Sequence, residues 1–230
     1  MVKIVQPPVL LLHGWGSSFT DTWEATGITS LLEDAHRECI GVDLLGHGTA
    51  PKSHDPNDYR DLGARVRDAL PHIPVDAVGF SLGALVLLQE LVRNPQRFHR
   101  VVLVGIGDGI FEETQDSDHQ RILAGLFGTA PDDDNIARLF GQYANRGSND
   151  IEALAAVINR PRSMPFVESD FCDIDNAVLV VVGDRDFVFP ASRLAHGFPN
   201  GSLKVLNNTD HFKTPESFQF IDAMLEFLGA

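Results

Sequence analysis

A five-residue segment, Gly79 to Gly83, constrains this chain more than any other part of its sequence. It reads GFSLG and so has the pattern G-x-S-x-G. The residues before it are typical of the end of a buried strand, and the apolar run after it is typical of a helix. Small residues around a serine permit a sharp turn that exposes the hydroxyl beside the N–H groups of a helix N-terminus. The segment therefore predicts a strand, a turn and a helix, with Ser81 as a nucleophile; an ordinary strand-to-helix turn is the alternative.

Six short apolar runs predict β-strands. They are continuously apolar rather than alternating, as expected when helices cover both faces of a sheet. The runs span residues 9–13, 39–43, 75–80, 101–106, 177–182 and 202–206, and helical patterns over 20–36, 58–70, 82–94 and 215–229 lie between or after them. This alternation predicts an α/β fold with a doubly wound, mostly parallel sheet of about six strands and right-handed crossovers.

One connection, residues 108–176, departs from this alternation. It contains no β-rich run, and helical patterns cover residues 118–127, 133–143 and 150–159, each beginning with an aspartate. Acidic residues suit a helix N-terminus, and loops this long inside a compact domain are usually functional. At the other end of the chain, residues 1–8 leave room for one short edge strand at most.

Four further motifs accompany the serine segment. They are HGWG at 13–16, GHG at 46–48, GDRD at 183–186 with Pro190 beyond it, and DH at 210–211. A serine, an acid and a histidine in this order are typical of the α/β-hydrolase triad. Over nearly its whole length the chain resembles a small member of the α/β-hydrolase superfamily, of the serine esterase type with an HGWG oxyanion turn.

The resemblance implies a catalytic role for three side chains. Ser81 needs a base, and only His196 and His211 follow the acidic loop; His211, just past a strand, is preferred. Asp186 and Asp184 are both candidates for the acid. The family spacing G-x-x-D-x-x-x-P favours Asp186, which leaves Asp184 to cap the loop or pair with a neighbouring arginine.

The same resemblance assigns an oxyanion hole to the backbone N–H groups of Trp15 and Leu82. The indole of Trp15 is expected either to line an acyl pocket or to be a core aromatic. His13 is expected to hold the HGWG turn by hydrogen bonds, and the GHG loop around His47 to be structural.

By resemblance, residues 108–176 form a short helical cap over the active site, and residues 1–107 and 177–230 form the hydrolase core of a single domain. Apolar side chains of the cap are expected to line the substrate pocket. Phe111, Phe127 and Phe140 are the candidates.

The predicted function is hydrolysis of carboxylic esters with small or medium acyl groups through an acyl-enzyme. Lactone, thioester or C–C bond hydrolysis would use the same triad and stays open. A binding protein that keeps the fold without turnover is the alternative from another class. No cofactor is expected, and no metal-ligand spacing is visible.

Composition limits the partners and the compartment. The 230 residues carry a net charge of −14, which argues against nucleic acid, anionic membranes and acidic carrier proteins as partners. The chain has no apolar run long enough to span a membrane, no visible signal peptide and two distant cysteines, Cys39 and Cys172. A cytoplasmic protein acting on a small ester-like substrate is the resulting expectation; the oligomeric state is left open.

Overall fold

The computed structural model describes residues 6–113, 115–147 and 149–230. The edge strand allowed for in residues 1–8 falls mostly outside these ranges. The described part forms a six-stranded sheet in the order β2-β1-β3-β4-β5-β6, and every neighbouring pair is parallel. The strands are β1 (Val9–Leu12), β2 (Cys39–Val42), β3 (Val75–Phe80), β4 (Phe98–Val104), β5 (Ala177–Gly183) and β6 (Gly201–Leu206).

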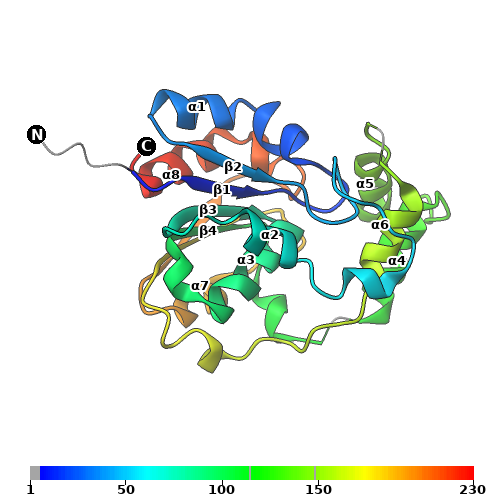
Figure 1. Cartoon of the computed structure of the whole chain (residues 1–230). Coiled ribbons are helices and arrows are strands. Elements are labelled where there is room, and N and C mark those ends of the chain that lie inside the picture. The colour runs from blue at the N-terminus through cyan, green and yellow to red at the C-terminus, as the bar shows by residue number, and fades with distance from the viewer. Residues whose placement is uncertain (1–5, 114, 148) are drawn as a thin grey trace, which may run out of the picture.

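Helices cover both faces of this sheet (Figure 1). The central strands are therefore largely buried on both sides, whereas the edge strand β6 alternates and exposes Ser202 and Lys204. The helices outside residues 108–176 are α1 (Ile28–Asp34), α2 (Ala64–Ala69), α3 (Leu82–Arg93), α7 (Ser192–Gly197) and α8 (Phe218–Leu228). Leu10 and Leu12 pack into the core under α2 and α3, while Val9 and Leu11 pack into the core under α1 and α8. The predicted doubly wound α/β sheet is therefore confirmed.

Three expected helices are shorter than their apolar patterns. The pattern over residues 20–36 is divided into a π-helical turn, η1 (Thr20–Glu24), and α1, because Gly27 between them has φ +80°. The pattern over 58–70 is also divided into two elements, the 3-10 turn η2 (Pro56–Tyr59) and α2. A third turn, η6 (Thr214–Glu216), precedes α8.

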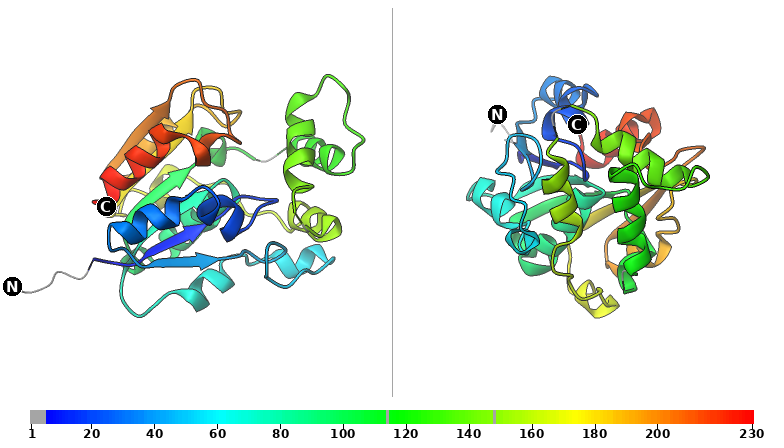
Figure 2. Two further views of the ribbon diagram at one scale, coloured as in Figure 1. Left: turned by 90° about the horizontal axis from the view of Figure 1, so that it is seen from above. Right: turned by 90° about the vertical axis from the view of Figure 1, so that its right-hand side faces the viewer.

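The residues between β4 and β5 form a helical group at one end of the sheet. It contains α4 (Asp116–Leu126), α5 (Asn135–Ala144) and α6 (Ile151–Ile158). The 3-10 turns η4 (Asp108–Phe111) and η5 (Glu168–Asp170) of the same connection lie beside α7 instead, where Leu194 N donates to Asp108 and Arg193 pairs with Glu168. Figure 2 shows this group standing apart from the other helices, beyond the ends of the strands. Asp150 accepts a hydrogen bond from Ala153 N and begins α6, as the acidic pattern suggested, whereas α5 is begun by Asp134, which accepts from Ala137 N, rather than by the expected Asp133. We call residues 108–176 the insertion.

Candidate active site

Ser81 lies on a strained turn between β3 and α3. Its φ of +52° and ψ of −113° are unusual for a residue with a side chain. The turn is tight because a Cβ at Gly79 would lie 2.6 Å from Gly83 O, and a Cβ at Gly83 would lie 2.5 Å from Leu12 O. Both glycines are thus required for α3 to approach β1 and β3 closely, and the serine hydroxyl points out of the turn.

His211 lies between Ser81 and Asp186. Its Nε2 is 3.0 Å from Ser81 Oγ, and its Nδ1 is 2.9 Å from Asp186 Oδ2 and 3.0 Å from Asp186 Oδ1. Asp186 and His211 are buried, with 5% and 3% of their surface exposed. The Asp186 carboxylate accepts a hydrogen bond from Nδ1–H, and this leaves Nε2 free to accept the serine proton. Serine, histidine and acid thus form one continuous chain of hydrogen bonds.

The alternative acid, Asp184, and the alternative base, His196, both lie away from Ser81. Asp184 is exposed and accepts a hydrogen bond of 3.2 Å from Thr209 N, so it joins the loops after β5 and β6. Backbone hydrogen bonds from Asn208 and Thr209 lower the pKa of its carboxyl. His196 lies at the end of α7, and it makes no hydrogen bond with Ser81 in the part of the chain that the structure describes.

The HGWG turn lies directly beside Ser81. A Cβ at Gly14 would be 3.4 Å from the Cβ of Ser81. No described residue accepts a hydrogen bond from the backbone N–H of Trp15, and Leu82 is the first residue of α3, where helix N–H groups have no partner in the helix. His13 holds the turn as expected: its Nδ1 donates to Gly14 O, and its Nε2 accepts from Leu44 N at 3.0 Å.

The indole of Trp15 is a core aromatic that also contacts the insertion. Only 6% of Trp15 is exposed, and its ring packs edge-on against Phe140 of α5 at 5.9 Å. Its Nε1 donates a hydrogen bond of 3.1 Å to Leu154 O of α6. Trp15 was expected to line an acyl pocket or to be a core aromatic, and its position is that of a core aromatic.

Aromatic rings enclose the imidazole of His211. The ring of Phe187 lies 4.5 Å from it and that of Phe80 lies 5.1 Å from it. Phe140 reaches this group from α5, 5.6 Å from Phe187 and 5.2 Å from Phe212. The insertion therefore packs directly on the loops that carry Asp186 and His211.

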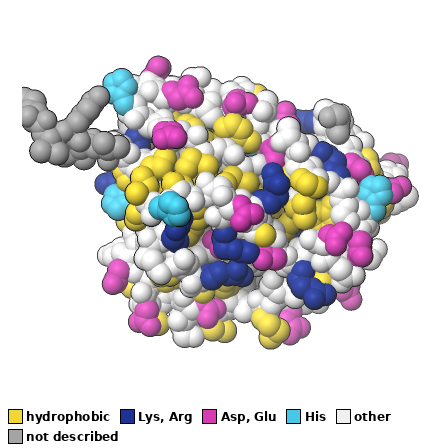
Figure 3. Space-filling view, in the orientation of Figure 1, with side chains coloured by type: hydrophobic (Ala, Val, Ile, Leu, Met, Phe, Trp, Pro, Cys, Tyr) yellow, Lys and Arg dark blue, Asp and Glu magenta, His cyan; other side chains and the backbone are white. Residues whose placement is uncertain are grey.

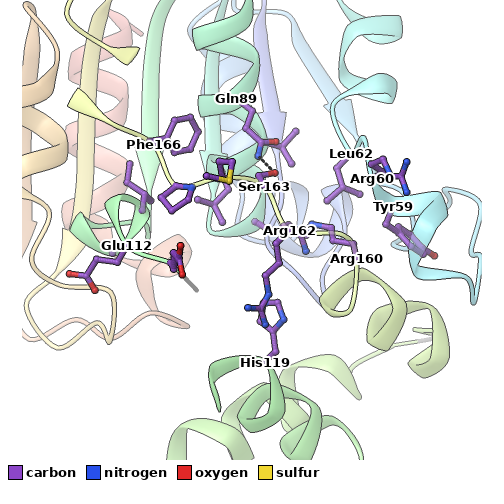
Figure 4. Close-up of a pocket in the computed structure, with 18 residues that line it drawn as sticks. Tyr59, Arg60, Leu62, Gln89, Glu112, His119, Arg160, Arg162, Ser163 and Phe166 are labelled. Carbon is purple, nitrogen blue, oxygen red and sulfur yellow. Dashed lines mark hydrogen bonds between the residues drawn. The ribbon is translucent and has the colours of Figure 1, made fainter. Parts of the chain in front are cut away.

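The three phenylalanines expected in the substrate pocket lie in different places. Phe140 belongs to the aromatic group just described, and Phe111 packs against Phe171 at 5.9 Å. Phe127, at the end of α4, is 54% exposed. None of the three lines the cavity beside Leu82, which has a volume of about 330 Å³ (Figure 4).

Sequence analysis missed several residues that do line this cavity. They include His119, Arg160, Arg162 and Phe166, all from the insertion. The two arginines and Phe166 lie on a connection without regular structure, and no motif or periodicity marks them. Among the described residues, no group of three or more His, Cys, Asp or Glu side chains could hold a metal ion. Within the same residues, no helix has the length and apolar character needed to cross a bilayer.

Comparison with known proteins agrees with this architecture. A 2-hydroxymuconate semialdehyde hydrolase from Pseudomonas putida is 28% identical over 254 residues, which covers 95% of this chain and 85% of that protein. A pimeloyl-acyl-carrier-protein methyl ester esterase from Aromatoleum aromaticum is 38% identical over 102 residues, 44% of this chain and 37% of that protein.

The solved structure of a 2-hydroxy-6-oxo-6-phenylhexa-2,4-dienoate hydrolase from Rhodococcus sp. strain RHA1 shares the fold, with a TM-score of 0.74 and 21% identity over 98% of this chain and 91% of that one. A model of the alpha/beta hydrolase family matches residues 9–220. The match includes the strained serine turn, the acidic loop after β5 and the loop of His211. This chain belongs to the alpha/beta hydrolase family.

Proposed function

We propose that the protein is a serine hydrolase that cleaves carboxylic esters of small or medium acyl groups through an acyl-enzyme. The observation that carries this proposal is the position of His211, hydrogen-bonded to Asp186 on one side and to Ser81 on the other. A serine alone is a weak nucleophile, and a histidine within 3.0 Å of its hydroxyl is the base that it needs.

The reaction follows from this geometry. Ser81 Oγ attacks the ester carbonyl while its proton moves to His211 Nε2, and Asp186 stabilises the imidazolium that forms. The negative oxygen of the tetrahedral intermediate accepts hydrogen bonds from the backbone N–H groups of Trp15 and Leu82. His211 then protonates the leaving alcohol. Water, deprotonated by the same nitrogen, attacks the acyl-enzyme, and the acid product leaves Ser81 with its proton restored.

We also propose that the insertion is a cap over this site and that residues 1–107 and 177–230 are the core of a single hydrolase domain. Two contacts support this division. Trp15, beside the reacting serine, is bonded to Leu154 of α6, and Phe140 of α5 lies against the aromatic residues around His211. A helical group that touches both loops of the triad limits which substrates reach Ser81.

A second candidate is hydrolysis of a C–C bond. The relative that matches 95% of this chain bears the name 2-hydroxymuconate semialdehyde hydrolase, whereas the match to the methyl ester esterase covers 44%. Lactones and thioesters would suit the same triad. An acidic carrier protein is a poor partner for a chain with a net charge of −14, so we propose a small-molecule substrate.

A fluorophosphonate probe tests whether the triad is competent. The probe should label Ser81 of the native chain, identified by mass spectrometry of the modified peptide, and the Ser81→Ala variant should remain unlabelled. A folded native chain that does not react would favour a binding protein over an enzyme. Rates on 4-nitrophenyl butyrate and on 2-hydroxymuconate semialdehyde then decide between ester and C–C bond cleavage, because the preferred bond should give the larger kcat/KM.

A further inference from the structure

The cavity beside Leu82 has an apolar part and a basic part. The apolar part is lined by side chains from α3, η4 and the end of the insertion: Leu82, which directly follows Ser81 in the chain, and Leu85, Val86, Ile110 and Phe166. The basic part lies where the insertion meets η2, and Arg60, Arg160, Arg162 and His119 line it. The volume of about 330 Å³ is within the range of small-molecule sites. A ligand that fits both parts has an apolar chain and an anionic end.

Arg160 is the residue that most requires such an anion. It is partly buried, and Nη1 donates a hydrogen bond of 2.7 Å to Val157 O. In the part of the chain that the structure describes, no carboxylate lies within ion-pair distance of its guanidinium. Burial lowers the pKa of Arg160, but an arginine stays charged in proteins. A partly buried cation without a counter-ion is costly, and a bound carboxylate would offset that cost.

The neighbouring groups favour an anion at the same place. Arg162 extends from the same connection toward His119 of α4 (Figure 4) and forms an ion pair with Asp116. Burial lowers the pKa of His119, and the nearby charges of Arg162 and Arg160 lower it further, so its neutral ring offers one N–H donor. The acidic lining residues Glu112 and Glu113 are exposed, and Figure 4 shows Glu112 across the cavity from Arg160.

Lys and Arg side chains lie at the centre of the face in Figure 3, and Asp and Glu side chains lie among them. Arg67 of α2, for example, forms ion pairs with Asp61 and Glu90. The surface charge is mixed, so the groups that favour an anion are those that line the cavity itself.

We infer that this cavity binds the ionised carboxylate of a substrate whose other end is the bond cleaved at Ser81, with Arg160 as the principal contact. The apolar chain between the two ends lies along Leu85, Val86 and Phe166. This inference rests on the proposed hydrolase function and adds the substrate class: an acyl compound with a free carboxylate, rather than a neutral ester.

A matched pair of esters tests it. Monomethyl adipate has a free carboxylate, and dimethyl adipate has the same chain without one. The native protein should give a kcat/KM at least about tenfold higher on the monomethyl ester, since a hydrogen bond to a charged group contributes about that factor or more. Arg160→Met, which keeps the apolar stem, should lose about 10- to 100-fold on the monomethyl ester, mainly through KM, and little on the dimethyl ester.

Two further variants sharpen the comparison. Arg160→Lys keeps the charge and should recover part of the preference. Arg138→Met removes an exposed arginine of α5 that lies outside the cavity, and both rates should stay as in the native protein. Equal losses on both esters in Arg160→Met, or a native protein without preference for the monomethyl ester, would overturn the inference while leaving the hydrolase proposal intact.

A binding measurement separates the two proposals. The Ser81→Ala protein, which cannot turn over, is titrated with each ester by calorimetry. Tighter binding of the monomethyl ester, lost in Ser81→Ala/Arg160→Met, supports the carboxylate site even if the native protein hydrolyses neither ester. Equal or undetectable binding of both esters overturns it.

Discussion

The indole Nε1 of Trp15 donates a hydrogen bond of 3.1 Å to the backbone oxygen of Leu154, so the turn after β1 is joined directly to helix α6 of the insertion. A second hydrogen bond joins the same two parts in the opposite direction: Asn149 Nδ2, of the insertion, donates to Gly16 O at 2.8 Å. The turn that carries the proposed oxyanion donor and the helices above it are therefore held in one arrangement. A change that loosens either bond should affect both stability and turnover.

Substitution of Trp15 by phenylalanine should show both effects. Trp15→Phe keeps an aromatic ring against Phe140 but removes the donor, so we expect a loss of about 1 kcal/mol in the free energy of unfolding from the hydrogen bond, added to the loss from the smaller ring. Turnover should also fall, because the N–H of this residue is the proposed oxyanion donor and the turn is less firmly held.

Trp23→Phe is the matched control. Trp23 is fully buried, but its Nε1 has no hydrogen-bond partner among the described residues. Trp23→Phe removes the same atoms as Trp15→Phe but breaks no hydrogen bond, so kcat should not change. Urea titrations and initial rates on 4-nitrophenyl butyrate measure both quantities. Equal kcat in the two variants would mean that the bond between Trp15 and Leu154 does not hold the turn for catalysis.

The two aspartates after β5 should differ sharply in their effect on turnover. Asp186→Asn leaves the size unchanged but removes the carboxylate that orients His211, and we expect kcat to fall about 10⁴-fold. Asp184→Asn alters only the hydrogen bonds that join the loops after β5 and β6, and it should have a much smaller effect. Steady-state rates on the same ester, with circular dichroism to verify folding, make the comparison. The reverse order of losses would assign the acid to Asp184.

The fold could be predicted because it depends on local features of the sequence. Buried parallel strands are continuously apolar, and the serine turn has glycines where a Cβ would clash, so both were visible without a structure. The ends of the helices were harder to predict. The apolar pattern over residues 20–36 continues across Gly27, but the positive φ of this glycine divides the segment into two elements. Hydrophobic periodicity shows which face is apolar but not where a glycine interrupts the backbone.

The lining of the cavity beside Leu82 could not be predicted in the same way. Phe127 and Phe140 are apolar residues on helices of the insertion, but which neighbour each one meets depends on how α4 and α5 pack on the core. That packing involves residues far apart in sequence, such as Phe140 with Phe187 and Phe212. The position of Arg160 in the cavity lining could not be predicted, because a single arginine on an irregular connection is usually exposed to solvent.

A buried ion pair far from the active site should matter for stability alone. Arg37 and Asp76 are both about 1% exposed and form a salt bridge, and Arg37 also donates to Pro7 O and Leu228 O. Arg37→Met leaves Asp76 buried with only His99 and the backbone N–H of Arg100 as partners, so we expect a loss of about 3 kcal/mol in the free energy of unfolding, the lower end of the range for breaking a buried pair. Arg121→Met, at the exposed pair with Asp134, should cost about 0–1 kcal/mol. Urea denaturation of both variants measures the difference, and similar losses would show that burial does not strengthen the first pair.

Acid should destabilise the protein partly through His47. This side chain is fully buried, its Nδ1 donates to Leu45 O at 3.1 Å, and its Nε2 has no partner among the described residues. Burial and, to a smaller extent, the nearby ring of His13 lower the pKa of His47 to about 3, whereas the unfolded chain has the ordinary value of 6.5. Between these two values the unfolded state binds a proton that the folded state does not, so stability falls as the pH falls below about 6.5.

The slope due to one such group is about 1.4 kcal/mol per pH unit. In His47→Gln, which cannot bind this proton, the free energy of unfolding should depend less steeply on pH between 6 and 4.5, by about that amount. Above pH 7 the difference between the native protein and the variant should be constant, because neither state then binds the proton. Urea titrations at several pH values provide the test. Parallel curves across the whole range would mean that His47 does not gain its proton on unfolding, and that the acid sensitivity lies in other groups.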